Sequence, residues 1–161
     1  RPVSYASLWF HSDDACYELV DLLGINQYTG WYDILGTPGR AADYGVLEQK
    51  LRAACAQAGR PVLLTEFGAD AVPGFRAEDA PLWSEEYQAD LLCRTIRAAL
   101  RVEGVAGTFP FLFNDYPDPS KPVNGRWDGR NFKGIVTEHR DRKAAFQALA
   151  GLYAEIERTG A

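Results

Sequence analysis

The sequence predicts an α/β fold built from parallel strand–helix units. Two observations support this prediction: four short apolar runs are typical of buried strands, and the apolar residues of the longer segments between and after them recur at helical spacing. Near-continuous apolar strands that alternate with helices form a parallel sheet covered by helices. A doubly wound sheet and part of a (β/α)8 barrel both fit this order. A full barrel needs about 200 residues or more, so these 161 residues would form half of one.

The four expected strands are short, and each one ends where polar or aromatic residues take over. We predict strands over Val3–Phe10, Leu22–Gln27, Val62–Phe67 and Val105–Phe113. Between the first two, Asp13–Val20 is expected to form a short helix. No glycine-rich phosphate motif follows the first strand, which counts against a dinucleotide-binding sheet.

Three longer helices are expected where apolar residues recur every three or four positions. These positions are Tyr44, Leu47, Leu51, Cys55 and Ala58, then Tyr87, Leu91, Ile96 and Leu100, and finally Phe146, Leu149, Tyr153 and Ile156. Ser84 is a suitable cap for the second helix, and Glu85 and Glu86 are favourable in its first turn. The stretch Asn114–Lys133 is rich in Pro, Gly, Asp and Asn, and we predict a long loop of the kind that often carries function.

The bulk composition is that of one globular domain, so residues 1–161 are treated as a single partial-barrel unit. Hydrophobic residues make up 47% and charged residues 24%, which excludes a disordered chain. The net charge of −5, with both signs interleaved, argues against nucleic acid as a partner, and no apolar run is long enough for a membrane span. Three cysteines without a CxxC pair indicate neither a zinc site nor a disulfide framework. We expect a cytoplasmic protein with no metal and no cofactor.

The residues that follow each strand are the candidate site, because ligands of parallel α/β folds bind at the carboxyl ends of the strands. These positions carry aromatic, amide and carboxylate side chains, namely His11, Asn26, Tyr28, Trp31, Tyr32, Glu66, Phe111, Asp115, Asn131 and Lys133. Sugars present apolar ring faces and rims of hydroxyl groups, and this set of side chains suits both. The strand ends therefore favour a carbohydrate as the partner, although aromatic residues on their own more often belong to a core.

Four separated motifs then carry a resemblance to a known family. They read INQYTGWYDI (25–34), PVLLTEFGAD (61–70), WSEEYQADLL (83–92) and NFKGIVTEHRDRKAAF (131–146). In this order they resemble the later part of the catalytic barrel of glycoside hydrolase family 2, and within it they look most like the β-glucuronidases. The resemblance implies a (β/α)8 TIM barrel, of which this chain would supply the last four units, strands five to eight. It also implies hydrolysis of β-glycosides by a retaining, double-displacement mechanism.

Within this resemblance, Glu66 matches the catalytic nucleophile. A retaining glycosidase needs an ionised carboxylate that attacks the anomeric carbon and forms a glycosyl-enzyme ester. A rigid strand end suits that task, and Gly68 leaves room beside it. Tyr28 matches a family tyrosine that contacts the sugar and the nucleophile, and its phenol can hydrogen-bond the carboxylate. The alternative for Glu66 is a solvated glutamate at a strand end.

Asn131 and Lys133 match a triplet that grips the sugar carboxylate in the glucuronidases of this family. Lysine supplies a positive charge and asparagine an amide donor. A neutral hexose would leave Lys133 unpaired, so this pair predicts uronic acids over ordinary glycosides. A solvated lysine in a loop is the alternative for Lys133. Galactosidase or galacturonidase activity stays open as an alternative activity.

Other residues of the strand ends have less definite roles. Asn26 is expected on the same face as Tyr28. Trp31 and Tyr32 are expected to form the pocket wall or to pack in the core, and His11 either contacts substrate or faces solvent. Phe111 stands where the family usually carries a tryptophan that lines the sugar site. It keeps an apolar face but lacks the indole N–H.

Two aspartates near the strand ends have expected supporting roles. Asp70 follows the Glu66 motif and is expected to bond backbone groups of the nucleophile loop. Asp115 ends the fourth strand and either binds a sugar hydroxyl or caps a turn.

The general acid of a retaining mechanism has no candidate in this sequence. The family places that glutamate directly after an asparagine, and no Asn-Glu pair occurs here. Retaining cleavage needs two carboxyl groups about 5–5.5 Å apart. We therefore expect a piece of a longer, homo-oligomeric enzyme, inactive alone or dependent on a partner half. A carbohydrate-binding remnant without chemistry and a half barrel that dimerises to hide its edges are the two alternatives.

Overall fold

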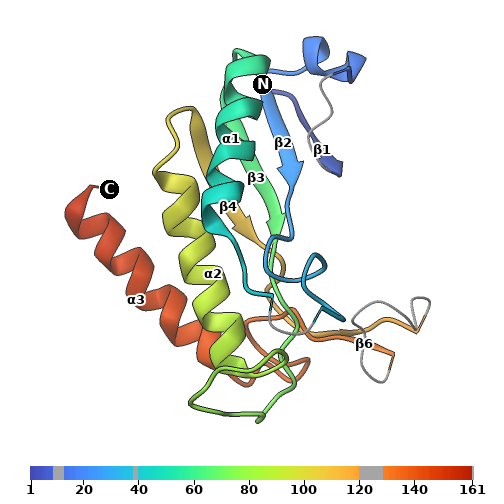
Figure 1. The fold of residues 1–161 in the computed structure, drawn as a ribbon, viewed down its shortest axis with the longest axis vertical. Coiled ribbons are helices and arrows are strands. Elements are labelled where there is room, and N and C mark those ends of the chain that lie inside the picture. Colours follow the sequence, from blue (N-terminus) through green and yellow to red (C-terminus); the bar gives the residue numbers. More distant parts are fainter. Residues whose placement is uncertain (9–12, 38–39, 120–128, 161) are drawn as a thin grey trace.

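The computed structural model describes residues 1–8, 13–37, 40–119 and 129–160, and its centre is a four-stranded parallel sheet (Figure 1). The strands lie in sequence order as β1 (Ser4–Leu8), β2 (Leu22–Asn26), β3 (Val62–Phe67) and β4 (Val105–Pro110). Helix α1 (Tyr44–Ala58) connects β2 to β3, α2 (Glu85–Leu100) connects β3 to β4, and α3 (Ala144–Thr159) follows. This order confirms the predicted parallel (β/α) units of a partial barrel.

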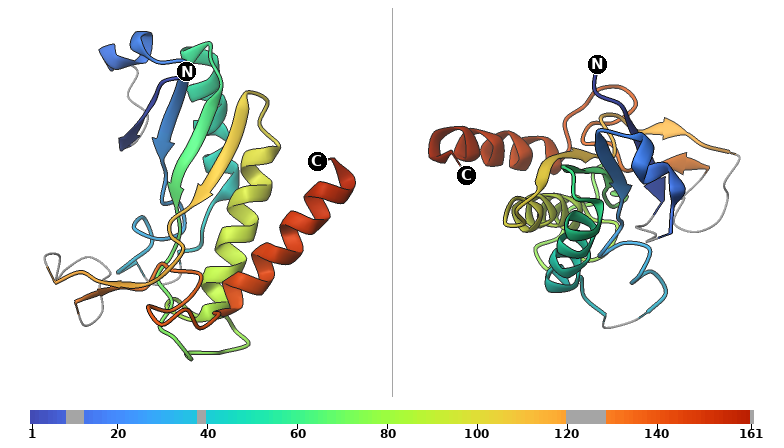
Figure 2. Two further views of the ribbon diagram at one scale, coloured as in Figure 1. Left: turned by 180° about the vertical axis from the view of Figure 1, so that it is seen from behind. Right: turned by 90° about the horizontal axis from the view of Figure 1, so that it is seen from above.

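The helices gather on one side of the sheet, with α3 the farthest from the strands (Figure 2). Helices α1 and α2 pack against the strands, whereas α3 packs along α2. Leu8 of β1 and Phe109 of β4 are more than half exposed, so these strands present apolar side chains to solvent. Among the described residues, no helix has both the length and the apolar character that a membrane crossing requires.

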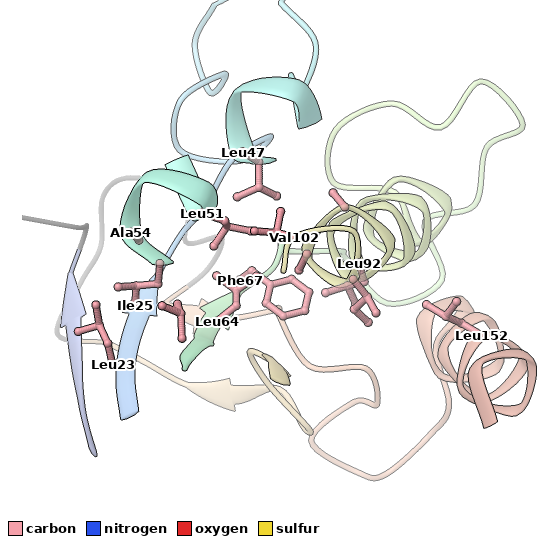
Figure 3. Close-up of a cluster of buried hydrophobic side chains, with 14 of the residues drawn as sticks. Leu23, Ile25, Leu47, Leu51, Ala54, Leu64, Phe67, Leu92, Val102 and Leu152 are labelled. Atoms are coloured by element: carbon pink, nitrogen blue, oxygen red, sulfur yellow. The ribbon is translucent and has the colours of Figure 1, made fainter. Parts of the chain in front are cut away.

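The core fills the space between β2, β3 and the helices (Figure 3). Its strand side chains alternate along the chain, as expected for a sheet with one covered face. The main contributors are Leu23, Ile25, Val62 and Leu64 from the strands, Leu47, Leu51 and Ala54 from α1, Leu92 and Ile96 from α2, and Leu149 and Leu152 from α3. Burying each large aliphatic side chain stabilises the fold by about 1.5–3 kcal/mol. Packing of the strands against the helices thus fixes the positions of the strand ends.

Two predicted elements differ from the structure at their ends. The fourth strand ends at Pro110 and not at Phe113, because the backbone beyond it pairs with another segment: Leu112 donates to the Lys133 carbonyl, and Ile135 donates to the Leu112 carbonyl. The predicted loop over Asn114–Lys133 contains a short antiparallel ribbon of β5 (Tyr116–Pro117) and β6 (Arg130–Asn131).

The predicted short helix is present as a 3-10 helix over Ala15–Leu19. Asp14 begins it, because its side chain accepts from the Cys16 N–H and its carbonyl accepts from the Tyr17 N–H. The predicted first strand extends to Phe10, but its described part ends at Leu8, and the residues that follow lie outside the described ranges.

Candidate active site

Glu66 lies at the carboxyl end of β3, and Tyr28 reaches it from the neighbouring strand. The sheet register pairs Asn26 of β2 with Glu66, and the backbone N–H of Gln27 donates to the Glu66 carbonyl at 2.8 Å. The Tyr28 hydroxyl donates to Glu66 Oε2 at 2.8 Å. The structure therefore contains the hydrogen bond that the sequence predicted, between a buried phenol and a half-buried carboxylate.

The environment of Tyr28 keeps its phenol a hydrogen-bond donor. Burial first, and then the hydrogen bond to Glu66 and the charge of that carboxylate, raise the pKa of Tyr28 well above its ordinary value. The hydroxyl consequently stays protonated throughout the physiological pH range and holds the Glu66 carboxylate in one orientation.

Gly68 allows the backbone of Phe111 to pass close to the end of β3. A side-chain Cβ at this position would lie 2.5 Å from the carbonyl oxygen of Phe111, which is too close for any residue other than glycine. The N–H of Phe111 in turn donates to the Phe67 carbonyl at 2.9 Å. Half-buried Phe111 thus lies beside the end of β3, at the rim that the sequence predicted for it.

Asn26 lies beside the nucleophile candidate but is bonded to another residue. Its Oδ1 accepts a hydrogen bond from the Thr65 hydroxyl at 2.8 Å. Asn26 is half-buried, so this contact fixes its amide at the edge where β2 and β3 end. His11, the remaining candidate of the first strand, lies outside the described residues.

The two aromatic candidates after β2 occupy different environments. Trp31 is fully buried and packs edge-on against Trp83 with ring centroids 4.9 Å apart, so the core alternative describes its position. Tyr32 is 37% exposed and packs against Tyr28, with ring centroids 4.9 Å apart. Tyr32 is therefore the more accessible wall of the candidate site.

Lys133 is buried at the centre of this aromatic group. Its Nζ lies 5.9, 5.5 and 5.0 Å from the ring centroids of Tyr28, Trp31 and Tyr32, within the range of cation–π attraction. The ammonium also forms an ion pair with Asp70 Oδ2, and both side chains are at most 1% exposed. Tyr28 connects this group to the nucleophile candidate, because its ring faces Lys133 and its hydroxyl bonds Glu66.

Asn131 is completely buried and hydrogen-bonded within the protein. Its Oδ1 accepts from the Lys133 backbone N–H at 3.1 Å, and its Nδ2 donates to the Tyr116 hydroxyl at 3.3 Å. The expectation that Lys133 is unpaired without a uronic acid is wrong, because Asp70 already supplies a counter-charge. The solvated-loop alternative is also wrong, since Asn131 and Lys133 are both buried.

Asp70 bonds a backbone group, as expected, but that group belongs to the segment that carries Lys133 and not to the loop after β3. Asp70 Oδ1 accepts from the Phe132 N–H at 2.7 Å, while Oδ2 binds Lys133 Nζ. The Ala71 N–H donates to the Phe132 carbonyl at 2.9 Å. The loop after β3 and the segment 131–134 are consequently joined side by side.

A second buried ion pair, between Asp115 and Lys143, was not predicted as a pair. Lys143 Nζ donates to Asp115 at 3.1 Å and to the carbonyls of Ala71 at 3.0 Å and Phe132 at 2.8 Å. The Gly134 N–H donates to Asp115 Oδ1 at 2.8 Å, so Asp115 also bonds the backbone of the segment that carries Lys133. Burial raises the pKa of Asp115 to about 6 although Lys143 opposes this shift, and burial lowers the pKa of Lys143.

Helix α2 begins at the Ser84 cap that the sequence predicted, and its first residues bond the backbone of this region. The Ser84 hydroxyl accepts from the Tyr87 N–H at 3.1 Å. Glu85 has a further task that the sequence did not suggest, since it accepts from the Ala144 N–H at 2.7 Å in the first turn of α3. The Gln88 amide donates to the Ala69 carbonyl at 2.9 Å and the Phe132 carbonyl at 3.3 Å.

Sequence reasoning missed Lys143, Gln88 and Tyr116. Lys143 ends the charged run Glu138–Lys143, which looks like a solvated surface and contains no signal that one member is buried. Gln88 lies on a helix, and Tyr116 lies in a predicted loop. Gln88 bonds carbonyls 19 to 46 positions away, and Tyr116 bonds Asn131 15 positions away, so local patterns cannot reveal these contacts.

The comparisons with known proteins agree with this geometry. Residues 1–158 match the family described as glycosyl hydrolases family 2, TIM barrel domain. A β-glucuronidase of Paenibacillus borealis is 32% identical over 139 residues, covering 86% of this chain and 22% of that protein.

Solved structures of similar proteins superpose on nearly the whole chain. A β-galacturonidase of Eisenbergiella tayi bound to galacturonate has a TM-score of 0.77 and 31% identity, over 96% of this chain and 27% of that chain. A β-glucuronidase of Faecalibacterium prausnitzii has a TM-score of 0.79 and 30% identity, over 97% and 25%. The chain spans about a quarter of the length of these relatives. The profile match over nearly all of its length shows that this chain belongs to glycosyl hydrolase family 2, as a part of the family's TIM barrel domain.

Proposed function

We propose that this chain is the nucleophile-bearing part of a retaining β-glycosidase that acts on uronic acid glycosides, β-glucuronides foremost. The observation that carries the proposal is the hydrogen bond from Tyr28 to Glu66 at a strand end, beside the buried ammonium of Lys133. One group can attack a sugar, and the other can recognise a sugar that bears a negative charge.

In the proposed reaction, a Glu66 carboxylate oxygen bonds to the anomeric carbon while the bond from that carbon to the leaving-group oxygen breaks. The leaving oxygen takes a proton from a general acid, which we place in the remainder of the barrel. In the second step a water gives a proton to the same acid, now acting as the base, and its oxygen bonds to the anomeric carbon while the bond from that carbon to Glu66 breaks. The product keeps the starting configuration and Glu66 is free again. Tyr28 keeps the attacking carboxylate oriented in the first step.

Recognition of the sugar carboxylate falls to Lys133, supported by Asn131. The Lys133 ammonium has three hydrogens, and among the described residues Asp70 is the one oxygen partner. The ammonium can therefore still donate to a second carboxylate. A uronic acid reaches this buried group only if Tyr32, the most exposed of the three rings, gives way. A neutral sugar gains nothing from such an approach.

Galacturonides are the second candidate substrates. The similarity to a β-galacturonidase bound to galacturonate supports them, and galacturonic acid carries the same carboxylate at the same ring position as glucuronic acid. Lys133 and Asn131 would serve both sugars. The choice between them depends on the hydroxyl at C4, which other residues of the rim contact.

The reaction as a whole depends on more than this chain. We propose that the chain alone turns over β-glycosides at a negligible rate, since a retaining mechanism requires a second carboxyl group. Homo-oligomeric assembly of the whole enzyme and its cytoplasmic location remain predictions, as do the assignments of Asn26, Trp31, Phe111 and His11 to substrate binding.

Covalent trapping tests the proposal directly. The protein is incubated with a 2-deoxy-2-fluoro-β-D-glucuronyl fluoride, whose activated leaving group departs without an acid catalyst, and its peptides are analysed by mass spectrometry. We expect a fluoroglucuronyl adduct on Glu66 and none in Glu66→Gln. An adduct on another carboxylate, or equal labelling of the variant, would overturn the assignment.

A further inference from the structure

We propose that Asp70 is a specificity-determining positioning residue, which holds the Lys133 ammonium in place for an anionic sugar. The inference rests on the proposed function and concerns a residue that touches neither the reacting atoms nor the sugar. Asp70 lies four positions after Glu66, in the loop that follows β3, is completely buried, and forms an ion pair with Lys133. The nucleophile loop thereby holds the recognition group directly.

The ion pair is needed because Lys133 has no access to water. A buried ammonium without a counter-charge is strongly unfavourable, and cation–π attraction from three rings compensates only part of that cost. Asp70 supplies the missing charge and also one hydrogen bond of defined direction. Both are in place before any ligand arrives, so a sugar carboxylate meets an ammonium that is already oriented.

The side chain of Asp70 does not hold the backbone of the segment by itself. Phe132 is also fixed through its carbonyl, which accepts from the Ala71 N–H at 2.9 Å, from Lys143 Nζ at 2.8 Å and from the Gln88 amide at 3.3 Å. Removing the Asp70 charge should therefore leave the segment 131–134 in position and release the Lys133 ammonium. This separates a positioning role from a general structural one.

Asp115 provides a matched control. It is also a buried carboxylate paired with a buried lysine, and it also accepts a backbone N–H, from Gly134. Its lysine, Lys143, is committed to backbone carbonyls and does not face the three rings. Substitution at Asp115 should therefore cost stability without changing which sugar is preferred.

The experiment measures KM and kcat for phenyl β-D-glucuronide and phenyl β-D-glucoside in the complete barrel, for wild type, Asp70→Asn, Asp115→Asn and Lys133→Met. We expect Asp70→Asn to raise KM for the glucuronide about 10-fold, with kcat and the glucoside KM little changed. Asp115→Asn should keep the wild-type preference. Unchanged or stronger preference for the glucuronide in Asp70→Asn would overturn the inference.

A double variant keeps the test decisive if Asp70→Asn folds poorly. Asp70→Asn combined with Lys133→Met removes both charges and leaves no unpaired buried ion. If Asp70 acts through Lys133, the double variant should show the same sugar preference as Lys133→Met alone. A further loss of preference in the double variant would contradict the inference. If Lys133→Met itself keeps the glucuronide preference, uronate recognition by Lys133 fails instead, which is a failure of the proposed function.

Discussion

Two buried aspartate–lysine pairs bind the peptide groups of Phe132, yet they differ in how completely the ammonium is hydrogen-bonded. In the Asp115–Lys143 pair, Nζ donates to the carboxylate and to two backbone carbonyls. In the Asp70–Lys133 pair, the carboxylate is the one oxygen that Nζ contacts within the described residues, and aromatic rings occupy the other directions.

We propose that this difference separates an ion pair that stabilises the fold from one that binds the sugar. An ammonium has three hydrogens to donate, and those of Lys143 have partners that join the nucleophile loop to the segment 131–134. Within the described residues Lys133 Nζ donates to one oxygen, which leaves hydrogen-bonding capacity that a ligand could use. We therefore assign Lys143 to the fold and Lys133 to recognition, although neither is exposed and both carry the same charge.

The largest expected effect comes from breaking the Asp115–Lys143 pair. Lys143→Met leaves Asp115 buried without its counter-charge and removes the bonds to two backbone carbonyls, which should cost about 3–5 kcal/mol of stability. Urea denaturation of the purified protein measures this cost. Lys133→Met removes an ammonium that has one oxygen partner in the part of the chain that the structure describes. If Lys143→Met loses less stability than Lys133→Met, the comparison is wrong.

The second effect is a pH dependence in the same pair. The pKa of Asp115 is raised to about 6, so its contribution to stability is complete below the unfolded value of about 3.8 and declines as the pH rises through 6. The stability of wild type relative to Asp115→Asn should therefore be greatest near pH 4 and fall by about 1–3 kcal/mol by pH 7. Paired urea titrations at both pH values measure this, and a difference that grows with pH would contradict it.

A smaller effect is expected from Tyr28, whose hydroxyl bonds Glu66 and whose ring faces Lys133. Tyr28→Phe removes the hydroxyl that orients Glu66 but keeps the ring that faces Lys133. We expect about a 10-fold slower rate of Glu66 labelling by the fluoroglucuronyl reagent, or about 1.4 kcal/mol, since one hydrogen bond is lost. Glucuronide KM should stay close to that of wild type. A large KM change with unchanged labelling would assign Tyr28 to sugar binding alone.

The sequence predicted the fold and the Tyr28–Glu66 contact more completely than the surroundings of the lysines. Parallel strands and helices follow from local periodicity, and the Ser84 cap follows from its residue type, whereas the Glu66–Tyr28 contact was implied by the family resemblance. The burial of Lys133 does not follow, because its counter-ion Asp70 is 63 positions away. From the sequence alone Lys133 looks like a solvated loop residue, because its partner Asp70 is brought near only by the tertiary fold.

The departures in the fold have a similar cause. The fourth strand ends early because residues 112–115 pair with 133–136 and not with β3. No local sequence pattern indicates this change of pairing partner. Asp115 had two expected roles, a bond to a sugar hydroxyl or a turn cap, and the structure instead bonds its side chain to the distant Gly134 N–H and Lys143 Nζ. These contacts join segments of the chain through tertiary packing alone.

The central claim is that Glu66 and Lys133 form one site, with the lysine selecting an anionic sugar. The most direct test compares kcat/KM for phenyl β-D-glucuronide and phenyl β-D-glucoside in the complete barrel, for wild type and Lys133→Met. The account predicts that the glucuronide loses about 100-fold and the glucoside less than about 3-fold, so that the preference collapses. Equal losses for the two substrates, or an unchanged preference, would contradict it.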